Sequence, residues 1–121
     1  MAKILIVDDE PIIADMLELR LGIRGHVVHK AADGRQGVDQ AMTLMPDLIL
    51  MDMQMPVMGG EEAVKHLRQK GYQGIIASLS AAAMEEEVKR AMDSGCNAAL
   101  TKPIGPDFEE SVEQLLERED G

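Results

Sequence analysis

The chain has 121 residues and 45% of them are hydrophobic, so we expect one ordinary domain, over residues 1–121, with a single core. A formal net charge of −10 argues against direct nucleic-acid binding, which requires clustered Lys and Arg side chains. The single cysteine, Cys96, cannot form an internal disulfide, and no 18-residue apolar span or signal peptide is visible, which predicts a cytoplasmic protein without membrane insertion.

Five short apolar runs follow one another along the chain, at residues 3–7, 26–29, 47–51, 74–79 and 97–100. Several are apolar without a break, as expected for strands that are covered on both faces. Between the runs, apolar residues recur at the spacing of one helical face. The five sets are Ile13, Met16, Leu17 and Leu21; Val38, Ala41, Met42 and Met45; Ala63, Val64 and Leu67; Met84, Val88, Ala91 and Met92; and Phe108, Val112, Leu115 and Leu116.

Proline and glycine mark the ends of these helical stretches. Pro11 and Pro106 stand where the first turn of a helix tolerates proline, and Pro46 ends another helix. Glycines follow three helical patterns, where a left-handed cap is expected, at Gly25, Gly71 and Gly95. Strict alternation of strand and helix predicts an α/β fold with a doubly wound, mostly parallel sheet and right-handed crossovers.

Polar residues follow four of the five predicted strands. Asp8 and Asp9 follow the first, Asp52 ends the third, Ser80 ends the fourth, and Lys102 follows the fifth. In open α/β sheets, ligands bind beyond the carboxyl ends of the strands, near the point where strand order reverses. Any one of these residues alone is explained by a helix cap, a turn or a surface charge. All five together favour one site, with the second strand at the edge of the sheet.

The charges of these residues indicate the chemistry. Two carboxylates about 4 Å apart repel by roughly 4 kcal/mol at an effective dielectric near 20. Three acids beside one lysine leave surplus negative charge, which Mg²⁺ with oxygen ligands relieves. A phosphoryl group bridged by that cation would find Lys102 as counter-charge, the Ser80 hydroxyl as donor and backbone N–H groups as a cradle. Asp52 is then a nucleophile that takes a phosphoryl group to form an acyl phosphate.

Four segments carry a family resemblance. They are "LIVDDE", "DLILMDMQMPVMGG", "IIASLSA" and "ALTKPI". In this order and spacing the chain resembles a response-regulator receiver domain of two-component signalling, over residues 3 to about 118. The resemblance implies a five-stranded parallel sheet of flavodoxin-like order 2-1-3-4-5 with helices on both faces. The segment "DMQMPVMGG" resembles the corresponding segment of receivers of hybrid histidine kinases more than that of receivers attached to DNA-binding regulators.

The resemblance implies that Asp52 is the phosphoacceptor. It implies that Asp9 binds Mg²⁺ (or Mn²⁺) directly, that Asp8 binds it mainly through water, and that Asp52 is also a ligand. The backbone carbonyl of Gln54 would supply another ligand. Gln54 and Ala82 would also flank the approach of the water that hydrolyses the acyl phosphate, and so modulate autodephosphorylation.

The resemblance also implies a switch. Lys102 would pair with the phosphoryl group, and its bond to Pro103 would be cis. Ser80 would be the switch hydroxyl that moves toward the phosphoryl group and repositions the loop and helix after the fourth strand. Ala99 departs from the pattern, because the family commonly has a rotating aromatic residue there. We therefore expect an activated surface that is read without a rotating ring.

The expected phosphoryl donor is a phosphohistidine on a histidine kinase or a histidine phosphotransfer protein. His26, His29 and His66 are expected at surface or edge positions rather than as internal donors. The output partner is not identified by the sequence. The chain is expected to be a signalling phosphoacceptor rather than an enzyme, with only self-catalysed phosphoryl transfer and slow autodephosphorylation. It is either a free-standing receiver or a piece of a larger protein.

Three other classes of protein remain as alternatives. An aspartyl-nucleophile hydrolase usually carries a second acid two positions after the nucleophile, where this chain has Gln54. A nucleotide or flavin binder would show a glycine-rich phosphate motif after the first strand, which is missing here. A receiver-like interaction module that works without phosphorylation would not need all five site residues.

Two further patterns allow a simple structural interpretation. Four methionines that follow one another closely suggest soft-metal binding, but packing in the core and loops is favoured. They are Met51, Met53, Met55 and Met58. The run "EEE" at 85–87 is interpreted as an exposed acidic face near a helix start.

Overall fold

Strands and helices alternate along the whole chain in the computed structural model, which describes residues 1–55, 57–80, 84–102 and 105–120. The strands are β1 (Lys3–Val7), β2 (Val27–Ala31), β3 (Leu48–Asp52), β4 (Ile75–Ser80) and β5 (Ala98–Thr101). The helices are α1 (Pro11–Ile23), α2 (Gly34–Leu44), α3 (Gly60–Gln69), α4 (Glu85–Ser94) and α5 (Phe108–Asp120). Among these described helices none has the length and apolar character needed to cross a membrane.

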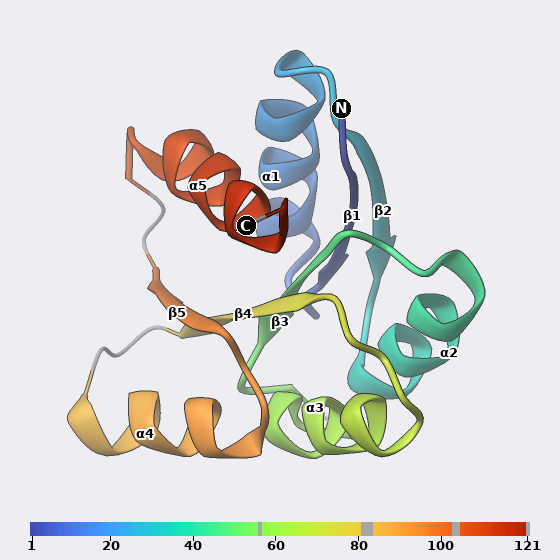
Figure 1. Cartoon of the computed structure of the whole chain (residues 1–121). Coiled ribbons are helices and arrows are strands. Elements are labelled where there is room, and N and C mark those ends of the chain that lie inside the picture. Colours follow the sequence, from blue (N-terminus) through green and yellow to red (C-terminus); the bar gives the residue numbers. More distant parts are fainter. Residues whose placement is uncertain (56, 81–83, 103–104, 121) are drawn as a thin grey trace.

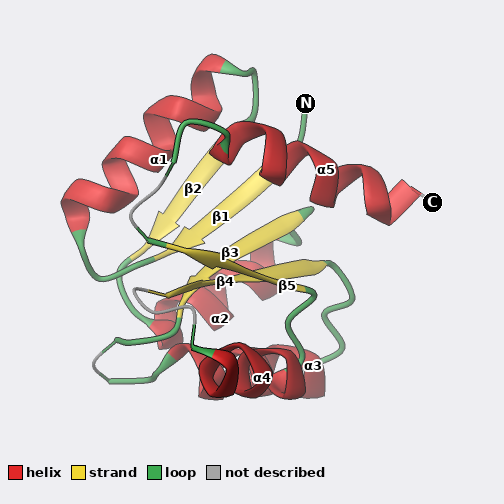
Figure 2. Cartoon of the chain, turned by 90° about the vertical axis from the view of Figure 1, so that its left-hand side faces the viewer, coloured by secondary structure: helices red, strands yellow, loops and turns green. Residues whose placement is uncertain are grey.

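The strands pair in the order β2-β1-β3-β4-β5, and every pair is parallel. The predicted flavodoxin-like order is therefore confirmed. Helices α1 and α5 cover one face of the sheet, and α2, α3 and α4 cover the other (Figures 1 and 2). Strands β1 and β3 lie inside the sheet and are buried from Ile4 to Val7 and from Leu48 to Asp52, whereas edge strand β2 is more exposed. Strand order thus places the ends of β1 and β3 next to each other.

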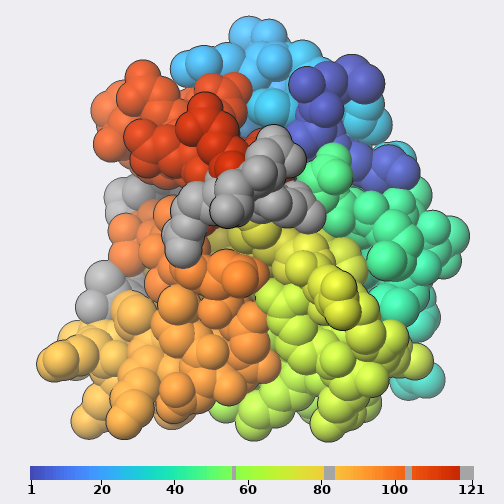
Figure 3. Space-filling view, viewed as in Figure 1, coloured from blue at the N-terminus to red at the C-terminus, as the bar shows by residue number. Residues whose placement is uncertain are grey.

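The two faces of the sheet carry two aliphatic cores. Alternate residues of β1 and β3 point to opposite faces, so Leu5 and Ile49 pack with α2 and α3, while Ile4 and Leu48 pack with α1 and α5. On the face that α2, α3 and α4 cover, α3 and α4 contact each other, and the space-filling view shows them side by side (Figure 3). Met51 is fully buried and Met53, Met55 and Met58 pack against the same core, which confirms packing as the role of these methionines.

Four methionines that the helical patterns place on buried faces are exposed: Met16, Met45, Met84 and Met92. Met45 and Met84 occupy the caps of α2 and α4, outside the regular helical stripe. On α1 the buried positions are Ala14, Leu17 and Leu21, so the stripe is shifted away from Met16. The helical faces expected from the apolar spacing therefore do not bury these four methionines.

Glycine and proline act largely as predicted. Pro11 is the first residue of α1, and Gly25, Gly71 and Gly95 have φ values of 90°, 94° and 127°. The prediction for Pro106 was wrong, because Pro106 lies in a turn and α5 begins at Phe108.

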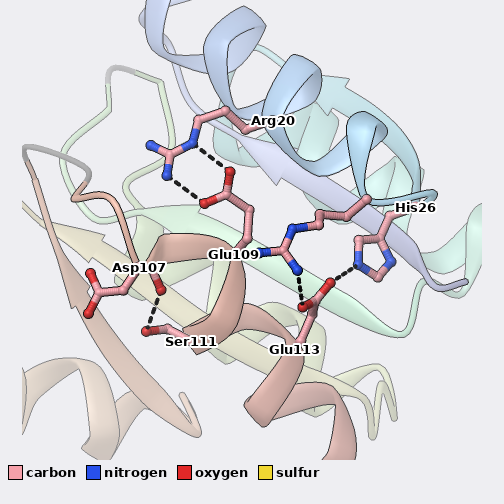
Figure 4. Close-up of polar contacts among 7 residues, drawn as sticks. Arg20, His26, Asp107, Glu109, Ser111 and Glu113 are labelled. Atoms are coloured by element: carbon pink, nitrogen blue, oxygen red, sulfur yellow. Dashed lines mark hydrogen bonds and ion pairs between the residues drawn. The ribbon is translucent and has the colours of Figure 1, made fainter.

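Ion pairs tie α5 to α1, the helix that follows the predicted acid pair (Figure 4). Arg20 Nε donates to Glu109 Oε2 at 2.9 Å, and Arg20 Nη2 donates to the carbonyl of Gly105 at 2.8 Å. Arg24 and the ring of His26 both contact Glu113, at 3.1 and 3.2 Å. Gly105 lies between Lys102 and α5, so these contacts join the segments that follow β1 and β5.

Candidate functional site

The carboxyl ends of β1, β3 and β5 bring three charged side chains together. Asp8 follows β1 directly, and its backbone N–H donates to Ala31 at 3.1 Å, which continues the pairing with β2. Asp52 is the last residue of β3, and the backbone N–H of Lys102 donates to the carbonyl of Ser80 at 2.8 Å. Asp8 and Asp52 are only 3% and 4% exposed, so both carboxylates are buried at the end of the sheet.

Lys102 contacts three carboxylates. Its Nζ atom lies 3.1 Å from Asp8 Oδ2, 3.1 Å from Glu10 Oε1 and 3.5 Å from Asp52 Oδ2. Asp9 is exposed beside them, and one carboxylate oxygen from each of the four acids lies within 4.8 Å of the others. Four carboxylates around one ammonium group leave a local surplus of negative charge.

Burial sets the acidity of Asp52. The pKa of Asp52 is raised from 3.8 to about 6, mainly because the carboxylate is buried and in part because of the charge of Asp8. The backbone N–H of Gln54, which donates to Asp52 Oδ1 at 3.1 Å, and the charge of Lys102 act in the opposite direction. Burial alone would lower the pKa of Lys102, but its contacts with the carboxylates of Glu10 and Asp8 outweigh burial and raise that pKa. Lys102 is therefore held in its charged form beside Asp52.

The donor set fits a hard divalent cation. Asp8 Oδ2 is buried and has no well-aligned hydrogen bond among the described residues, although Lys102 Nζ lies 3.1 Å away. A buried carboxylate oxygen that accepts no well-aligned hydrogen bond is costly, and a divalent cation would give it a second charged partner beside Lys102. Mg²⁺ and Mn²⁺ prefer oxygen ligands such as those of Asp8, Asp9 and Asp52. The backbone carbonyl of Gln54 as a further ligand stays a prediction.

The start of α3 packs directly on the backbone that carries Asp52. A Cβ atom at Gly60 would lie 2.8 Å from Met53 Cα and closer still to the carbonyl oxygen of Asp52. Only glycine permits this approach without a shift of the backbone. Met53 N–H donates to Leu79 at 3.1 Å, which fixes the same segment to β4.

Ser80 ends β4, and its hydroxyl donates to Glu87 Oε2 on α4 at 3.2 Å. Glu85 and Glu86 are exposed, as the sequence predicts for this run, but Glu87 is half-buried. The interpretation of the run as an exposed acidic face was therefore wrong for Glu87. Burial of Glu87 comes from packing of α4 near β4 and β5.

Ala99 lines a cavity of about 270 Å³ between β4, β5 and α4. Ser80, Glu87, Val88 and Ala91 line the same cavity. A small residue at position 99 thus leaves space beside the predicted switch hydroxyl. Two other predictions, for Ala82 and for the cis bond to Pro103, fall outside the described residues.

Two residues at the site were not singled out from the sequence. Glu10 belongs to the acidic cluster and contacts Lys102, and Glu87 contacts Ser80. For Glu10 a signal existed, since it directly follows the acid pair.

The histidines lie outside the acidic cluster. His29 lies on edge strand β2, as expected. The ring of His26 is mostly buried, and it accepts a hydrogen bond from Ala2 N–H and contacts Glu113.

A protein-family model described as the response regulator receiver domain matches residues 4–115. NarL, the nitrate/nitrite response regulator of Escherichia coli (strain K12), is 36% identical over 108 residues, which are 88% of this chain and 50% of NarL. PhoP, the alkaline phosphatase synthesis transcriptional regulatory protein of Bacillus subtilis (strain 168), is 35% identical over 117 residues, 96% of this chain and 49% of PhoP. The chain spans about half the length of the curated relatives it matches. Neither is named as a hybrid kinase, so that part of the resemblance stays a prediction.

Solved structures agree with the family match. The chemotaxis protein CheY4 of Vibrio cholerae has a TM-score of 0.89 and 33% identity, covering 96% of this chain and 98% of that chain. The receiver domain of the Francisella response regulator 1452 has a TM-score of 0.91 and 28% identity, covering 98% of this chain and 99% of that chain. With a family model matched over almost its whole length and close likeness to solved receivers, the chain belongs to the response regulator receiver domain family.

Proposed function

We propose that Asp52 is the phosphoacceptor of this receiver and takes a phosphoryl group from a phosphohistidine on a partner histidine kinase or phosphotransfer protein. The observation that carries the proposal is the position of Lys102 Nζ, 3.5 Å from Asp52 Oδ2 within a cluster of four carboxylates. A buried carboxylate beside a charged lysine, in a cluster of acids that would hold a divalent cation, suits a phosphoryl group that brings its own negative charge.

The proposed transfer is a displacement at phosphorus. An Asp52 carboxylate oxygen forms the new bond to phosphorus, while the bond from phosphorus to the donor's imidazole nitrogen breaks and its electron pair stays on that nitrogen. Lys102 offsets charge on the phosphoryl oxygens, and Asp8 and Asp9 hold the divalent cation together with Asp52. When bound, Mg²⁺ or Mn²⁺ neutralises charge and orients the phosphoryl oxygens. Gln54 and Ala82 are proposed to flank the water that later removes the phosphoryl group.

The wider role is also a proposal. Transfer to Asp52 is proposed to alter the surface after β4 through Ser80, for a downstream partner of unidentified nature. The chain's own activity is limited to self-catalysed transfer and slow loss of the phosphoryl group. A cytoplasmic location is supported by Cys96, which is buried as a free thiol.

A direct test uses a small phosphodonor. Incubation with acetyl phosphate and Mg²⁺, followed by intact mass measurement, is expected to add one phosphoryl group to the wild-type chain. Asp52→Asn is expected to abolish the addition, whereas Asp39→Asn, an exposed change on α2, is expected to retain it. Labelling without a divalent cation, or unchanged labelling of Asp52→Asn, would contradict the proposal.

The alternatives give different experimental outcomes. An interaction module that works without phosphorylation would show no mass addition. An aspartyl-nucleophile hydrolase would turn over phosphate esters many times per protein molecule, but position 54, where such enzymes usually carry a second acid, is Gln54 and is exposed.

A further inference from the structure

Ser80 and Glu87 form a contact between the end of the sheet and the first turn of α4. The Ser80 hydroxyl donates to Glu87 Oε2 at 3.2 Å. Both side chains are partly buried, and Glu87 is the innermost of three consecutive glutamates. An ionised carboxylate only accepts hydrogen bonds, so the hydroxyl proton is the donated atom.

A serine hydroxyl has one proton to donate. While the Ser80 hydroxyl donates its hydrogen bond to Glu87, it cannot donate one to an oxygen of a phosphoryl group on Asp52. Asp52 lies on β3, paired with Leu79, the residue that precedes Ser80. Glu87 and a phosphoryl group at Asp52 therefore compete for the same donor.

We infer that Glu87 is a positioning residue that holds the Ser80 hydroxyl in the resting orientation, and that this hydrogen bond must break when Asp52 is phosphorylated. The inference rests on the proposed phosphoacceptor role of Asp52. It goes further by naming Glu87 as the group on α4 that loses its hydrogen bond from Ser80 when Asp52 is phosphorylated.

The surrounding space allows this exchange. Ser80 and Glu87 both line the cavity of about 270 Å³ that Ala99 also lines. Because residue 99 is small, the released Glu87 side chain has room to reorient without displacing a ring. A carboxylate on the first turn of α4 thus takes the place of a rotating aromatic residue as the link between the site and α4.

The test measures the affinity of beryllofluoride, a mimic of the phosphoryl group that binds to aspartate carboxylates, in the presence of Mg²⁺ by ¹⁹F NMR. Apparent affinity is reduced by the fraction of protein that is not in the binding-competent state. Glu87→Ala removes the competing acceptor and is expected to tighten binding about three- to tenfold, the range for loss of an ordinary intramolecular hydrogen bond at a partly exposed position. Glu87→Gln keeps a neutral acceptor and is expected to lie between Glu87→Ala and wild type.

Two controls separate this role from a general charge or folding effect. Glu86→Ala removes the same charge from the same helical turn, but Glu86 is exposed, so affinity is expected to stay within about twofold of wild type. In a Ser80→Ala background, Glu87→Ala is expected to have no further effect beyond that of Glu86→Ala, because the acceptor then has no hydroxyl to hold.

The outcomes distinguish the two proposals. If wild-type protein is neither labelled by acetyl phosphate nor bound by beryllofluoride, the phosphoacceptor function fails. If wild type is labelled but Glu87→Ala matches Glu86→Ala, or keeps its full effect without the Ser80 hydroxyl, the positioning role of Glu87 is overturned. Thermal melting of each variant identifies any that does not fold, and Glu87→Gln then carries the test.

Discussion

Lys102 Nζ lies 3.5 Å from Asp52 Oδ2 and joins the ends of β3 and β5 across β4. The same ammonium group lies 3.1 Å from Asp8 Oδ2, so it contacts both of the buried carboxylates that would hold a divalent cation. The lysine and the cation therefore compete in part for the same oxygen atoms. Phosphorylation would relieve this competition, because phosphoryl oxygens offer the ammonium group new partners.

Lys102→Gln is expected to bind Mg²⁺ about three- to tenfold more tightly than wild type, because the positive charge beside the carboxylates that would hold the cation has been removed. The same variant is expected to lose most of its labelling by acetyl phosphate. Calorimetric titration with Mg²⁺ measures the first effect and intact mass the second. Lys70→Gln, an exposed change at the end of α3, serves as control. Weaker Mg²⁺ binding by Lys102→Gln would mean that the lysine orders the carboxylates rather than competing with the cation.

Asp52 is expected to reduce stability when it is ionised and no divalent cation is present. Its pKa in the folded chain is raised from 3.8 to about 6, so the folded state holds the proton more tightly than the unfolded state does. The free energy of unfolding should therefore fall as pH rises from about 4 to above 6, by an amount on the order of 3 kcal/mol.

Asp52→Asn removes this pH-dependent penalty and keeps an oxygen that accepts from Gln54. Urea unfolding in EDTA is expected to show Asp52→Asn about 2–3 kcal/mol more stable than wild type at pH 8, with little difference at pH 4. Asp39→Asn is expected to show no such pH-dependent gain. A less stable Asp52→Asn at pH 8 would show that the interaction of Asp52 with Lys102 outweighs its burial.

Strand positions could be predicted from the sequence to within two residues at every end. Every strand after β1 begins one residue later than its apolar run, and β3 and β4 extend to Asp52 and Ser80. The apolar run reports which residues are buried, whereas the strand also includes the polar residue that continues the hydrogen bonding. Asp52 shows this directly, since it pairs with Leu79 although it is charged.

The acid pair, Asp52 and Lys102 could be predicted as neighbours because parallel strands end at one edge of the sheet. Glu87 could not, because three consecutive glutamates are equivalent in the sequence. Only the packing of α4 near β4 and β5 decides which of them turns inward. The exposed methionines show the same limit, since helical spacing alone does not locate the edge of a buried stripe.

Gly60 is expected to be essential for the geometry of Asp52, because a Cβ atom there would collide with backbone rather than with a flexible side chain. Gly60→Ala is expected to lower the free energy of unfolding by about 2–3 kcal/mol and to slow labelling by acetyl phosphate. Gly22→Ala is the matched control, since no described heavy atom lies within 4 Å of its added Cβ. In α1 this change is expected to stabilise the chain by about 0.5–1 kcal/mol. Equal effects of the two changes would contradict the close approach at Gly60.

Arg20 is expected to stabilise the chain through Glu109, in a manner that depends on pH. The hydrogen bond from Arg20 lowers the pKa of Glu109 from 4.5 to about 2, and their side chains are only 22% and 15% exposed. Because the folded-state pKa is depressed, the stabilisation is fully present above about pH 4.5 and is lost as pH falls toward 2. Arg20→Ala is expected to cost about 1–2 kcal/mol at pH 7.

Urea unfolding at several pH values between 7 and 3 tests this dependence, and the gap between wild type and Arg20→Ala should narrow steadily below pH 4.5. Arg35→Ala is the control, because Arg35 is exposed on α2 and has no ion pair among the described residues. Arg20 also lies over the ring of Phe108, with 5.5 Å from Cζ to the ring centroid. A gap that stays constant down to pH 3 would therefore assign the contribution of Arg20 to its packing on Phe108 instead of its charge, since contact with an aromatic ring does not depend on the ionisation of Glu109.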